Sequence, residues 1–341
     1  MKIKLLDIKH ESAALHLTSK QKKELLELFN CENIKMVISR SSIQIKRLKQ
    51  AYDVMSENRK HKFEMMLKNV KFRAGRSKCI NLKYWIEITP DLCWLYGFLV
   101  GDGSMLRVCR FYNTNYFLVR RVKKIIKSHF GINIKKEPNR TIDFYVSKPV
   151  QIILEQIFGK KGKSVEAKVP KIFFDLPKEH VSSFITGIFD TDGTCSDIHV
   201  PSIMTPNLDL LLGLKSLLKQ KFDISTRISK TGHNHIITLG LFDKVKTFFN
   251  VLKFYEKIGF SHPRKANLLK MKVEKRTIYK IFQLVKSGIK QSRRIHNILK
   301  IDRSTVVDHL NKLEKFGLIE KKTKLFGVNN NLRIYEWHPT N

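Results

Sequence analysis

Two aspartates at matching positions of a repeated pattern are the residues best suited to chemistry in this sequence. The pattern is apolar-x-Gly-apolar-apolar-x-x-Asp-Gly, and it occurs at Leu95–Gly103 and again at Ile185–Gly193. Each copy closes an apolar stretch typical of a helix, so Asp102 and Asp192 are expected at two helix C-termini. Helices packed in parallel would bring both carboxylates to the negative ends of the helix dipoles. Such a pair needs a cation, and hard oxygen ligands favour Mg²⁺ completed by waters and phosphate oxygens.

Small residues within the same pattern predict how the two helices meet. Gly97 and Gly101 are four residues apart, as are Gly187 and Thr191. This spacing places small residues on one face of each helix, where backbones can approach closely. The alternative is a pair of core helices that end in Asp-Gly by accident. Two copies separated by 90 residues are hard to obtain by chance.

The predicted elements that follow each motif also repeat. A strand, a helix, two short strands and a helix are predicted in the same order over 89–180 and over 181–274. We interpret this as an internal duplication of an αββαββα-like unit in an α+β fold. One strand of the second unit alternates between apolar Ile224 and Ile228 and polar Ser225 and Arg227, which predicts a sheet with one buried and one polar face.

The two flanking regions carry separate predictions. Residues 1–88 are predicted to be a basic helical region that could bind DNA, either as a helix-turn-helix or as a simple helical hairpin. Residues 275–341 have the order of a winged helix-turn-helix, three helices and a hairpin, with Val307, Leu310 and Leu313 as the buried stripe of the third helix. A scaffold for protein contacts is the alternative. The residues of that third helix predicted to face DNA are Arg303, Ser304, Thr305, His309 and Lys312.

The charge of the chain indicates its partner. There are 65 lysines and arginines against 30 aspartates and glutamates, a formal net charge of +35. A compact chain with this excess repels itself unless a polyanion neutralises it, and nucleic acid is the commonest one, with an acidic membrane surface the only comparable target. No stretch approaches the length of a membrane span or a signal peptide, and the five cysteines form no CxxC pair. We therefore expect no membrane association and a reducing compartment: the cytoplasm of a prokaryote, at the nucleoid, or an organelle.

The segments LYGFLVGDG and ITGIFDTDG resemble the two motifs of a double-motif LAGLIDADG homing endonuclease, and the resemblance covers about residues 88–272. It implies a free-standing, monomeric enzyme of intron homing that cuts double-stranded DNA at a long asymmetric site. It implies that Asp102 and Asp192 hold Mg²⁺ together with the carbonyls of Gly101 and Thr191, and that Mn²⁺ can substitute. Asp190 matches the sixth motif position and Val100 departs from it, but that position does not bind metal in the family.

Family members also carry basic residues beside the metal site. By position after the last helix of each repeat, the candidates are Lys161 and Lys163 in the first repeat and Arg264 and Lys265 in the second. We assign Lys163 and Lys265 to catalysis and Arg264 to DNA contacts, whereas His262 fits a structural or DNA-contacting role. The polar strand faces would read base edges in the major groove. Their candidate readers are Asn133, Lys135, Tyr145, Ser225, Arg227 and His235.

Two other functions remain open on the same scaffold. A non-catalytic transcriptional regulator or an RNA-splicing maturase could use it, because fold does not fix function. The presence of both aspartates favours the nuclease, while the poorly placed lysines favour the regulator. An intact intein is not expected, because residue 1 is Met and Thr340 precedes Asn341 where a His would assist cyclisation.

Overall fold

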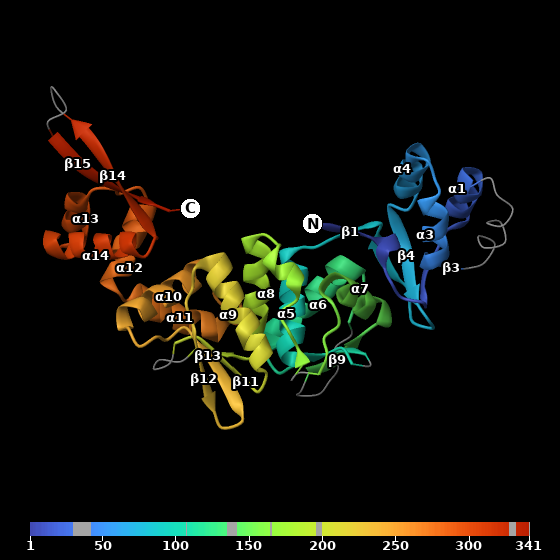
Figure 1. Cartoon of the computed structure of the whole chain (residues 1–341), viewed down its shortest axis with the longest axis horizontal. Helices are drawn as coiled ribbons and strands as arrows, with labels where there is room; N and C mark the ends of the chain where they lie inside the picture. The colour runs from blue at the N-terminus through green and yellow to red at the C-terminus, as the bar shows by residue number, and fades with distance from the viewer. Residues whose placement is uncertain are drawn as a thin grey trace.

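Two helices run side by side through the middle of the molecule. In the computed structural model, α5 (Pro90–Asp102) and α8 (Lys178–Thr191) lie together at the centre (Figure 1). Thr89 caps α5 by accepting from the Leu92 amide at 3.3 Å, Pro90 occupies its first turn, and Gly103 returns the chain to an extended conformation. The model describes residues 1–29, 42–106, 108–134, 142–163, 166–195, 200–326 and 332–340.

A small sheet and two helices follow α5. The sheet is antiparallel in the order β7-β8-β9. The elements are β7 (Gly103–Ser104), β8 (Cys109–Asn113), α6 (Tyr116–Phe130), β9 (Ile142–Val146) and α7 (Lys148–Phe158). The strand predicted at 132–137 is absent from 132–134, and 135–137 lie outside the described residues.

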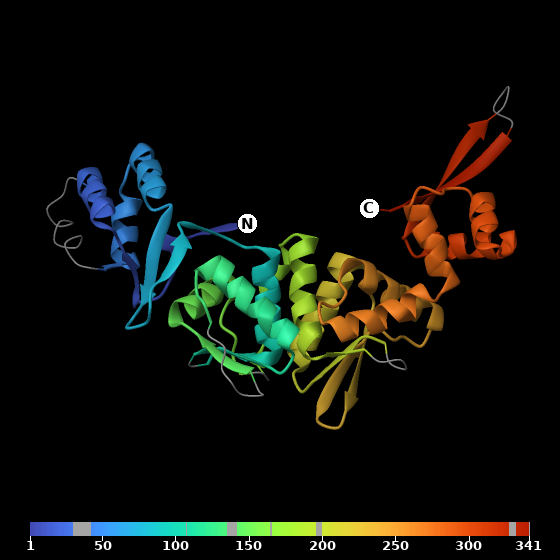
Figure 2. The ribbon, with the colours of Figure 1, turned by 180° about the vertical axis from the view of Figure 1, so that it is seen from behind.

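The segment that begins just before α8 contains a similar set of helices and strands. Its sheet has the antiparallel order β10-β11-β13-β12. The elements are η3 (Lys171–Phe174) before α8, then β10 (Gly193–Thr194), β11 (Ser202–Thr205), α9 (Leu208–Phe222), β12 (Arg227–Thr231), β13 (Asn234–Thr238), α10 (Lys244–Lys257) and α11 (Pro263–Glu274). Asn115 and Asn207 cap α6 and α9 in the same way, each accepting from an amide three residues on. Figures 1 and 2 show β9 and β11–β13 on one side of the molecule, at the C-terminal ends of α5 and α8.

The N-terminal region contains a sheet, so the prediction of a helical region over 1–88 is wrong. A four-stranded antiparallel sheet has the order β3-β2-β4-β5, and β1 pairs with β6. The residues NVKFRA and INLK alternate apolar and polar side chains, a period of two that a helix cannot use. The elements are β1 (Lys2–Lys4), η1 (Leu5–Asp7), β2 (Ala13–His16), α1 (Ser19–Phe29), β3 (Ile43–Gln44), α3 (Ile45–Asp53), α4 (Glu57–Met66), β4 (Asn69–Ala74), β5 (Ile80–Lys83) and β6 (Trp85–Glu87).

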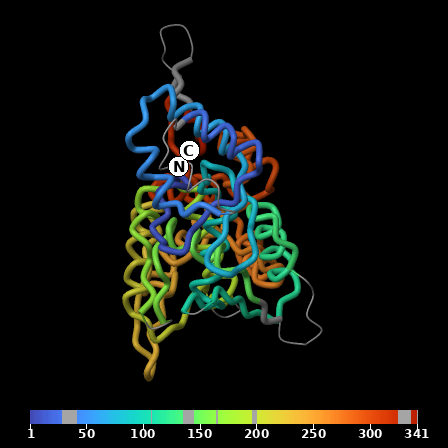
Figure 3. Tube along the Cα trace, turned by 90° about the vertical axis from the view of Figure 1, so that its right-hand side faces the viewer, coloured from blue at the N-terminus to red at the C-terminus, as the bar shows by residue number. Residues whose placement is uncertain are grey.

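The C-terminal region lies at the end of an elongated molecule opposite to the N-terminal region (Figure 1), so the two overlap in Figure 3, which looks along the longest axis. It consists of α12 (Thr277–Lys286), α13 (Ser292–Leu299), α14 (Arg303–Lys315) and the antiparallel pair β14 (Ile319–Phe326) and β15 (Leu332–Pro339). The buried stripe of α14 contains Val306 where Val307 was predicted, with Leu310 and Leu313 as expected. The hairpin tip at 327–331 lies outside the described residues. No helix in the described part of the chain is long and apolar enough to span a membrane.

Candidate active site

The backbones of α5 and α8 touch at two glycines. A Cβ atom added to Gly97 would lie 2.1 Å from the carbonyl oxygen of Phe184, and one added to Gly187 would lie 2.3 Å from that of Trp94. Only glycine fits at both positions without moving backbone atoms. A Cβ on Gly101 would lie 2.0 Å from the hydroxyl oxygen of Thr191. The structure therefore brings together the four small residues that the spacing placed on the helix faces.

This crossing sets the two motif aspartates next to each other. Asp102 is the last residue of α5 and Asp192 directly follows α8. A Cβ on Gly101 would lie only 3.3 Å from the carboxyl carbon of Asp192. Both side chains are partly buried, and Asn113 donates to the Oδ2 atom of Asp102 at 2.6 Å. Burial raises the pKa of both carboxyl groups, and with the added repulsion of Asp102 it raises the pKa of Asp192 to about 6.

A lysine lies against the C-terminal end of each of the two helices: the buried Lys161 at α5 and the partly buried Lys265 at α8. The Nζ atom of Lys265 donates to the carbonyls of Phe189, Asp190 and Thr191 at 3.1, 2.7 and 3.2 Å. That of Lys161 donates to the carbonyls of Leu99 and, at 2.5 Å, Gly103. These ammonium groups offset the negative helix ends. Burial lowers the pKa of both lysines, that of Lys161 to about 8.

The position of Lys161 corrects the assignment in the first repeat. Lys163, predicted to assist catalysis, is exposed, and its backbone amide donates to Glu166 at 3.3 Å. Lys161 is 5% exposed and faces the site instead. Counting residues from the end of a helix does not show which of two nearby lysines turns inward. The lysine of the second repeat, Lys265, does lie at the site.

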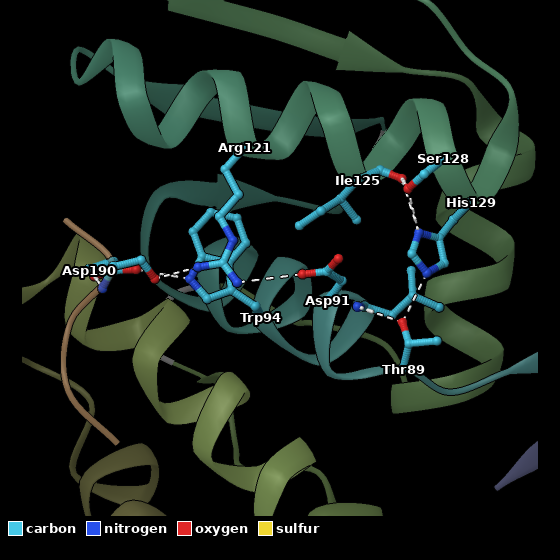
Figure 4. Close-up of polar contacts among 10 residues, drawn as sticks. Thr89, Asp91, Trp94, Arg121, Ile125, Ser128, His129 and Asp190 are labelled. Atoms are coloured by element: carbon cyan, nitrogen blue, oxygen red, sulfur yellow. Dashed lines mark hydrogen bonds and ion pairs between the residues drawn. The ribbon is translucent and has the colours of Figure 1, made fainter. Parts of the chain in front are cut away.

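The carboxylate of Asp190 connects α8 to α5 and to the residues just before α11, the helix that carries Lys265. This carboxylate is 1% exposed, and its Oδ1 atom accepts from the amides of Ser261 and His262 at 2.8 and 2.9 Å, directly before α11. Its Oδ2 atom accepts from the indole of Trp94 on α5 at 2.9 Å. Figure 4 shows this contact, with Arg121 over the same indole ring and reaching Asp91. Asp190 thus ties both repeats to the start of the helix that carries Lys265.

A second chain of contacts leads from His262 back to Asp102. The Nε2 atom of His262 lies 2.9 Å from the side-chain amide nitrogen of Asn115. The backbone amide of Asn115 donates to Asn113 at 2.7 Å, and Asn113 in turn holds Asp102. The sequence pattern assigned neither asparagine a role at the site. The contact between Asn115 and His262 joins residues 147 positions apart, so it leaves no local signal.

The predicted DNA-contacting residues differ in how exposed they are. Tyr145 is 52% exposed, with the guanidinium of Arg110 4.6 Å from its ring centre. Arg227 on β12 is exposed, and His235 opposes Lys230 across β12 and β13. Asn133 and Arg264 are exposed and Ser225 is partly buried, while Lys135 lies outside the described residues. None of these side chains contacts the Asp102–Asp192 pair in the described part of the chain.

The predicted recognition residues of α14 are less uniform. Arg303 and Ser304 are exposed. Thr305 is exposed as well and lines a pocket with His309, His296 and Asn297, and burial lowers the pKa of the partly buried His309. Lys312 pairs with Asp308 at 2.5 Å on the same helix. Arg303, Ser304 and Thr305 are thus the members of this set best placed to contact a ligand.

The donor set fits Mg²⁺. Within the described residues, no three His, Cys, Asp or Glu side chains cluster as metal ligands. Asp102 and Asp192 supply two carboxylates at a partly exposed position, and Mg²⁺ is commonly bound through one or two carboxylates while it keeps several waters. The raised pKa values show that two negative charges at this position need compensation.

Comparison with known proteins identifies the second repeat. Residues 179–259, which contain the second motif and Asp192, match the family model described as a LAGLIDADG-like domain. The match confirms the resemblance to the LAGLIDADG family that the motifs predicted.

Several curated proteins share part of this sequence. A probable translation initiation factor IF-2 of Thermococcus kodakarensis is 27% identical over 188 residues, or 52% of this chain and 15% of that protein. A DNA polymerase of Thermococcus litoralis is 25% identical over 222 residues, or 58% of this chain and 13% of that protein. The chain thus spans less than a fifth of the length of these two relatives. The solved structure of I-DmoI in complex with DNA and Mn is 13% identical, covering 50% of this chain and 97% of that one, with a TM-score of 0.38. A likeness at this level carries no argument about activity.

Proposed function

We propose that this protein is a site-specific double-strand DNA endonuclease that uses Mg²⁺ at Asp102 and Asp192. The observation that carries the proposal is the juxtaposition of two partly buried carboxylates at the C-terminal ends of α5 and α8. Their raised pKa values mean that keeping both ionised at neutral pH destabilises the folded protein. A divalent cation removes that cost, and a phosphodiester backbone is the substrate that a chain of net charge +35 attracts.

The residues around the pair have distinct roles in this proposal. Asp102 and Asp192, with the carbonyls of Gly101 and Thr191, would hold the metal, which when bound polarises a phosphate and lowers the pKa of a water. Asn113 fixes one oxygen of Asp102 and leaves the other free for a ligand. Lys265 holds the Thr191 carbonyl and adds positive charge beside the position of the scissile phosphate.

Lys161 performs the equivalent task in the first repeat. It binds the carbonyls of Leu99 and Gly103, which flank the residues that would hold the metal. The two lysines thus stand on either side of the aspartate pair and stabilise negative charge that develops on the phosphate. Because each ammonium is already bound by two or three carbonyls, we assign both lysines to electrostatic stabilisation and not to proton transfer.

We infer that residues 89–180 and 181–274 are a duplicated core. A helix, two strands and a helix recur from α5 to α6 and from α8 to α9, followed by one strand and a helix in the first segment and by two strands and a helix in the second, with matching Asn caps at α6 and α9. The two sheets lie on the side of the molecule where α5 and α8 end (Figure 1). We propose that they contact the major groove through exposed side chains such as Tyr145 and Arg227. We also infer that 275–341 is a winged helix that adds contacts through Arg303 and Ser304.

The kinds of protein that contain similar segments support the proposal that this sequence is a module that inserts into host genes. A translation initiation factor and a DNA polymerase share no chemistry, yet each contains a segment similar to about half of this chain. A segment found within otherwise unrelated proteins is expected of an element that spreads by cutting DNA at its insertion site. This pattern favours the endonuclease over a transcriptional regulator, which has no reason to reside inside such hosts.

Selection of cleaved sites from a random or genomic DNA library with Mg²⁺ tests the proposal. The wild-type chain should enrich one long asymmetric site, and the Asp102→Asn variant should enrich none while it still binds that site. A wild-type protein that binds one sequence tightly but leaves it intact in Mg²⁺ and in Mn²⁺ would identify a DNA-binding regulator instead.

A further inference from the structure

The hairpin formed by β4 and β5 is the part of the N-terminal region with the most uniform charge. Residues 69–83 contain five lysines and arginines and no aspartate or glutamate. Four of these cations are exposed and the fifth, Arg73, is partly buried. The exposed ones are Lys71, Arg76, Lys78 and Lys83. This hairpin was not recognised in the sequence, where the region was predicted to be helical.

The pleat of the hairpin separates its apolar and basic side chains. Val70, Phe72 and Leu82 are buried in the core of the N-terminal region. Lys71 therefore points to the opposite face, and across the strands it opposes Asn81. On the same face, Asn69 opposes Lys83 at the end of the strands away from the turn, where both line a cavity that also includes Glu64 and Glu87. One face of the hairpin thus presents ammonium and amide groups together, a combination suited to phosphate oxygens.

Three carboxylates of the N-terminal region pair with cations that lie outside the hairpin. Asp7 pairs with Lys49 at 2.8 Å, Glu64 with Lys4 at 3.2 Å, and Glu57 with Lys60 at 2.8 Å, all on other elements. Within the described residues no ion pair joins a cation of the hairpin to a carboxylate.

The pKa of the neighbouring His16 indicates the same excess of positive charge. The pKa of His16, which opposes Lys71 across β2 and β4, is lowered first by burial and then by the positive charges of Arg73, Lys71 and Lys22. Like charges collected without a counter-charge destabilise the folded state until an anion joins them. The face is therefore complementary to a polyanion.

The hairpin also lies where DNA would pass. Figures 1 and 2 show the free end of β4 and the following turn on the same side of the molecule as β9 and β11–β13. The N-terminal region contacts the first repeat, where the backbone amide of Lys9 donates to Gln156 of α7 at 3.1 Å. A duplex that follows the two sheets thus meets the hairpin beyond the first repeat, on one flank only.

We propose that the β4–β5 hairpin binds the phosphate backbone of duplex DNA on the flank adjoining the half of the target contacted by residues 89–180. The inference rests on the proposed function for the identity of the substrate. The contacts would position the protein without reading bases, because lysine and arginine side chains on phosphates carry no sequence information. They would also make the protein asymmetric on its target.

Charge removal in the hairpin tests this, with a matched control. The hairpin variant is Lys71→Gln, Arg76→Gln, Lys78→Gln and Lys83→Gln. The control variant is Lys23→Gln, Lys46→Gln, Arg47→Gln and Lys62→Gln, which removes three lysines and one arginine that are exposed on α1, α3 and α4. Both are made in a background of Asp102→Asn and Asp192→Asn, so that bound DNA stays intact, and both should melt within a few degrees of that background.

The readouts are the salt dependence of binding and a hydroxyl-radical footprint. Each lost phosphate contact should reduce the slope of log affinity against log salt by about 0.9, so the hairpin variant should lose roughly 2 to 4 from the slope and the control much less. The hairpin variant should also lose protection on one flank only. Equal slopes and equal footprints for the two variants would overturn the proposal and assign the hairpin to another polyanion.

Cleavage is scored separately, so the two proposals can fail independently. With both aspartates restored, the hairpin variant should cut saturating DNA at the rate of the wild type. If the wild type does not cut at all, the difference in salt slope and in footprint still decides whether the hairpin binds DNA.

Discussion

Replacing Gly97 with alanine adds one methyl group where the backbones of α5 and α8 touch. The new Cβ atom would lie 2.1 Å from the carbonyl oxygen of Phe184 and 3.2 Å from the Cα atom of Gly187. Both neighbours are backbone atoms of a buried helix, so the overlap can be relieved only if the helices separate by roughly 1 Å. Overpacking of this kind costs about 1 to 3 kcal/mol. For a domain of this size, a loss of about 2 kcal/mol lowers Tm by roughly 4 to 8 °C.

The assay is thermal unfolding followed by cleavage kinetics, with Gly213→Ala as the matched control. Gly213 is also helical, but its added Cβ would meet the side chain of Val169, and alanine has the better helix propensity. We expect Gly97→Ala to melt several degrees lower than this control. Because Asp102 lies one and a half turns further along α5, kcat should fall more than the affinity for DNA. A Gly97→Ala protein with the Tm and kcat of the wild type would refute the close crossing.

Four further perturbations test the surroundings of the crossing. Because the pKa of Asp192 is raised to about 6 in the folded protein from 3.8, its contribution to stability is present below pH 3.8 and is lost as the pH rises through 6. The metal-free Asp192→Asn protein should thus melt higher than the wild type at pH 7 but not at pH 4, and Mg²⁺ should raise the Tm of the wild type more at pH 7 than at pH 5, both by calorimetry. Asp190→Asn should reduce kcat at least tenfold with little change in DNA affinity, because the amide cannot accept from both the α11 amides and Trp94; unchanged kcat would separate Asp190 from the site. Lys161→Met should lower cleavage more than Lys163→Met, and the reverse order in matched kinetics would restore the assignment made by position. Arg303→Gln should reduce the salt slope of binding by about 0.9 and leave cleavage of saturating DNA unchanged, whereas an unaltered slope would assign α14 to a protein partner.

The sequence was sufficient to predict the parts of the fold that depend on local pattern. Each of the two motif helices and its glycine contacts are encoded within a few residues. The strand expected from Ile224 onward coincides with β12 only from Arg227, because residues 223–226 form no strand. The N-terminal sheet was missed because its strands are short and are separated by helices, so the pairing of β2 with β4 joins residues about 60 apart.

The sequence predicted the site less completely, because the residues that hold the site residues in place come from parts of the chain far apart in sequence. The resemblance gives Asp190 no metal-binding role. In the structure its carboxylate accepts from Trp94, 96 residues away, and from the backbone just before α11. Lys161 and Lys163 are equivalent by sequence, and only the loop conformation decides which ammonium is buried. In α14 the sequence predicted Val307 as the buried residue, whereas Val306 is buried. Three apolar positions in a short helix determine poorly which side of the helix faces the core.

The most direct test of the central claim is cleavage of the selected DNA site by three proteins at saturating concentration in Mg²⁺: the wild type, Asp102→Asn and Asp192→Asn. We predict double-strand cleavage by the wild type, none by either variant, and DNA affinity in the variants equal to or higher than that of the wild type, because a negative charge facing phosphate has been removed. Cleavage by both single variants at the rate of the wild type would contradict the assignment of the metal site to this pair.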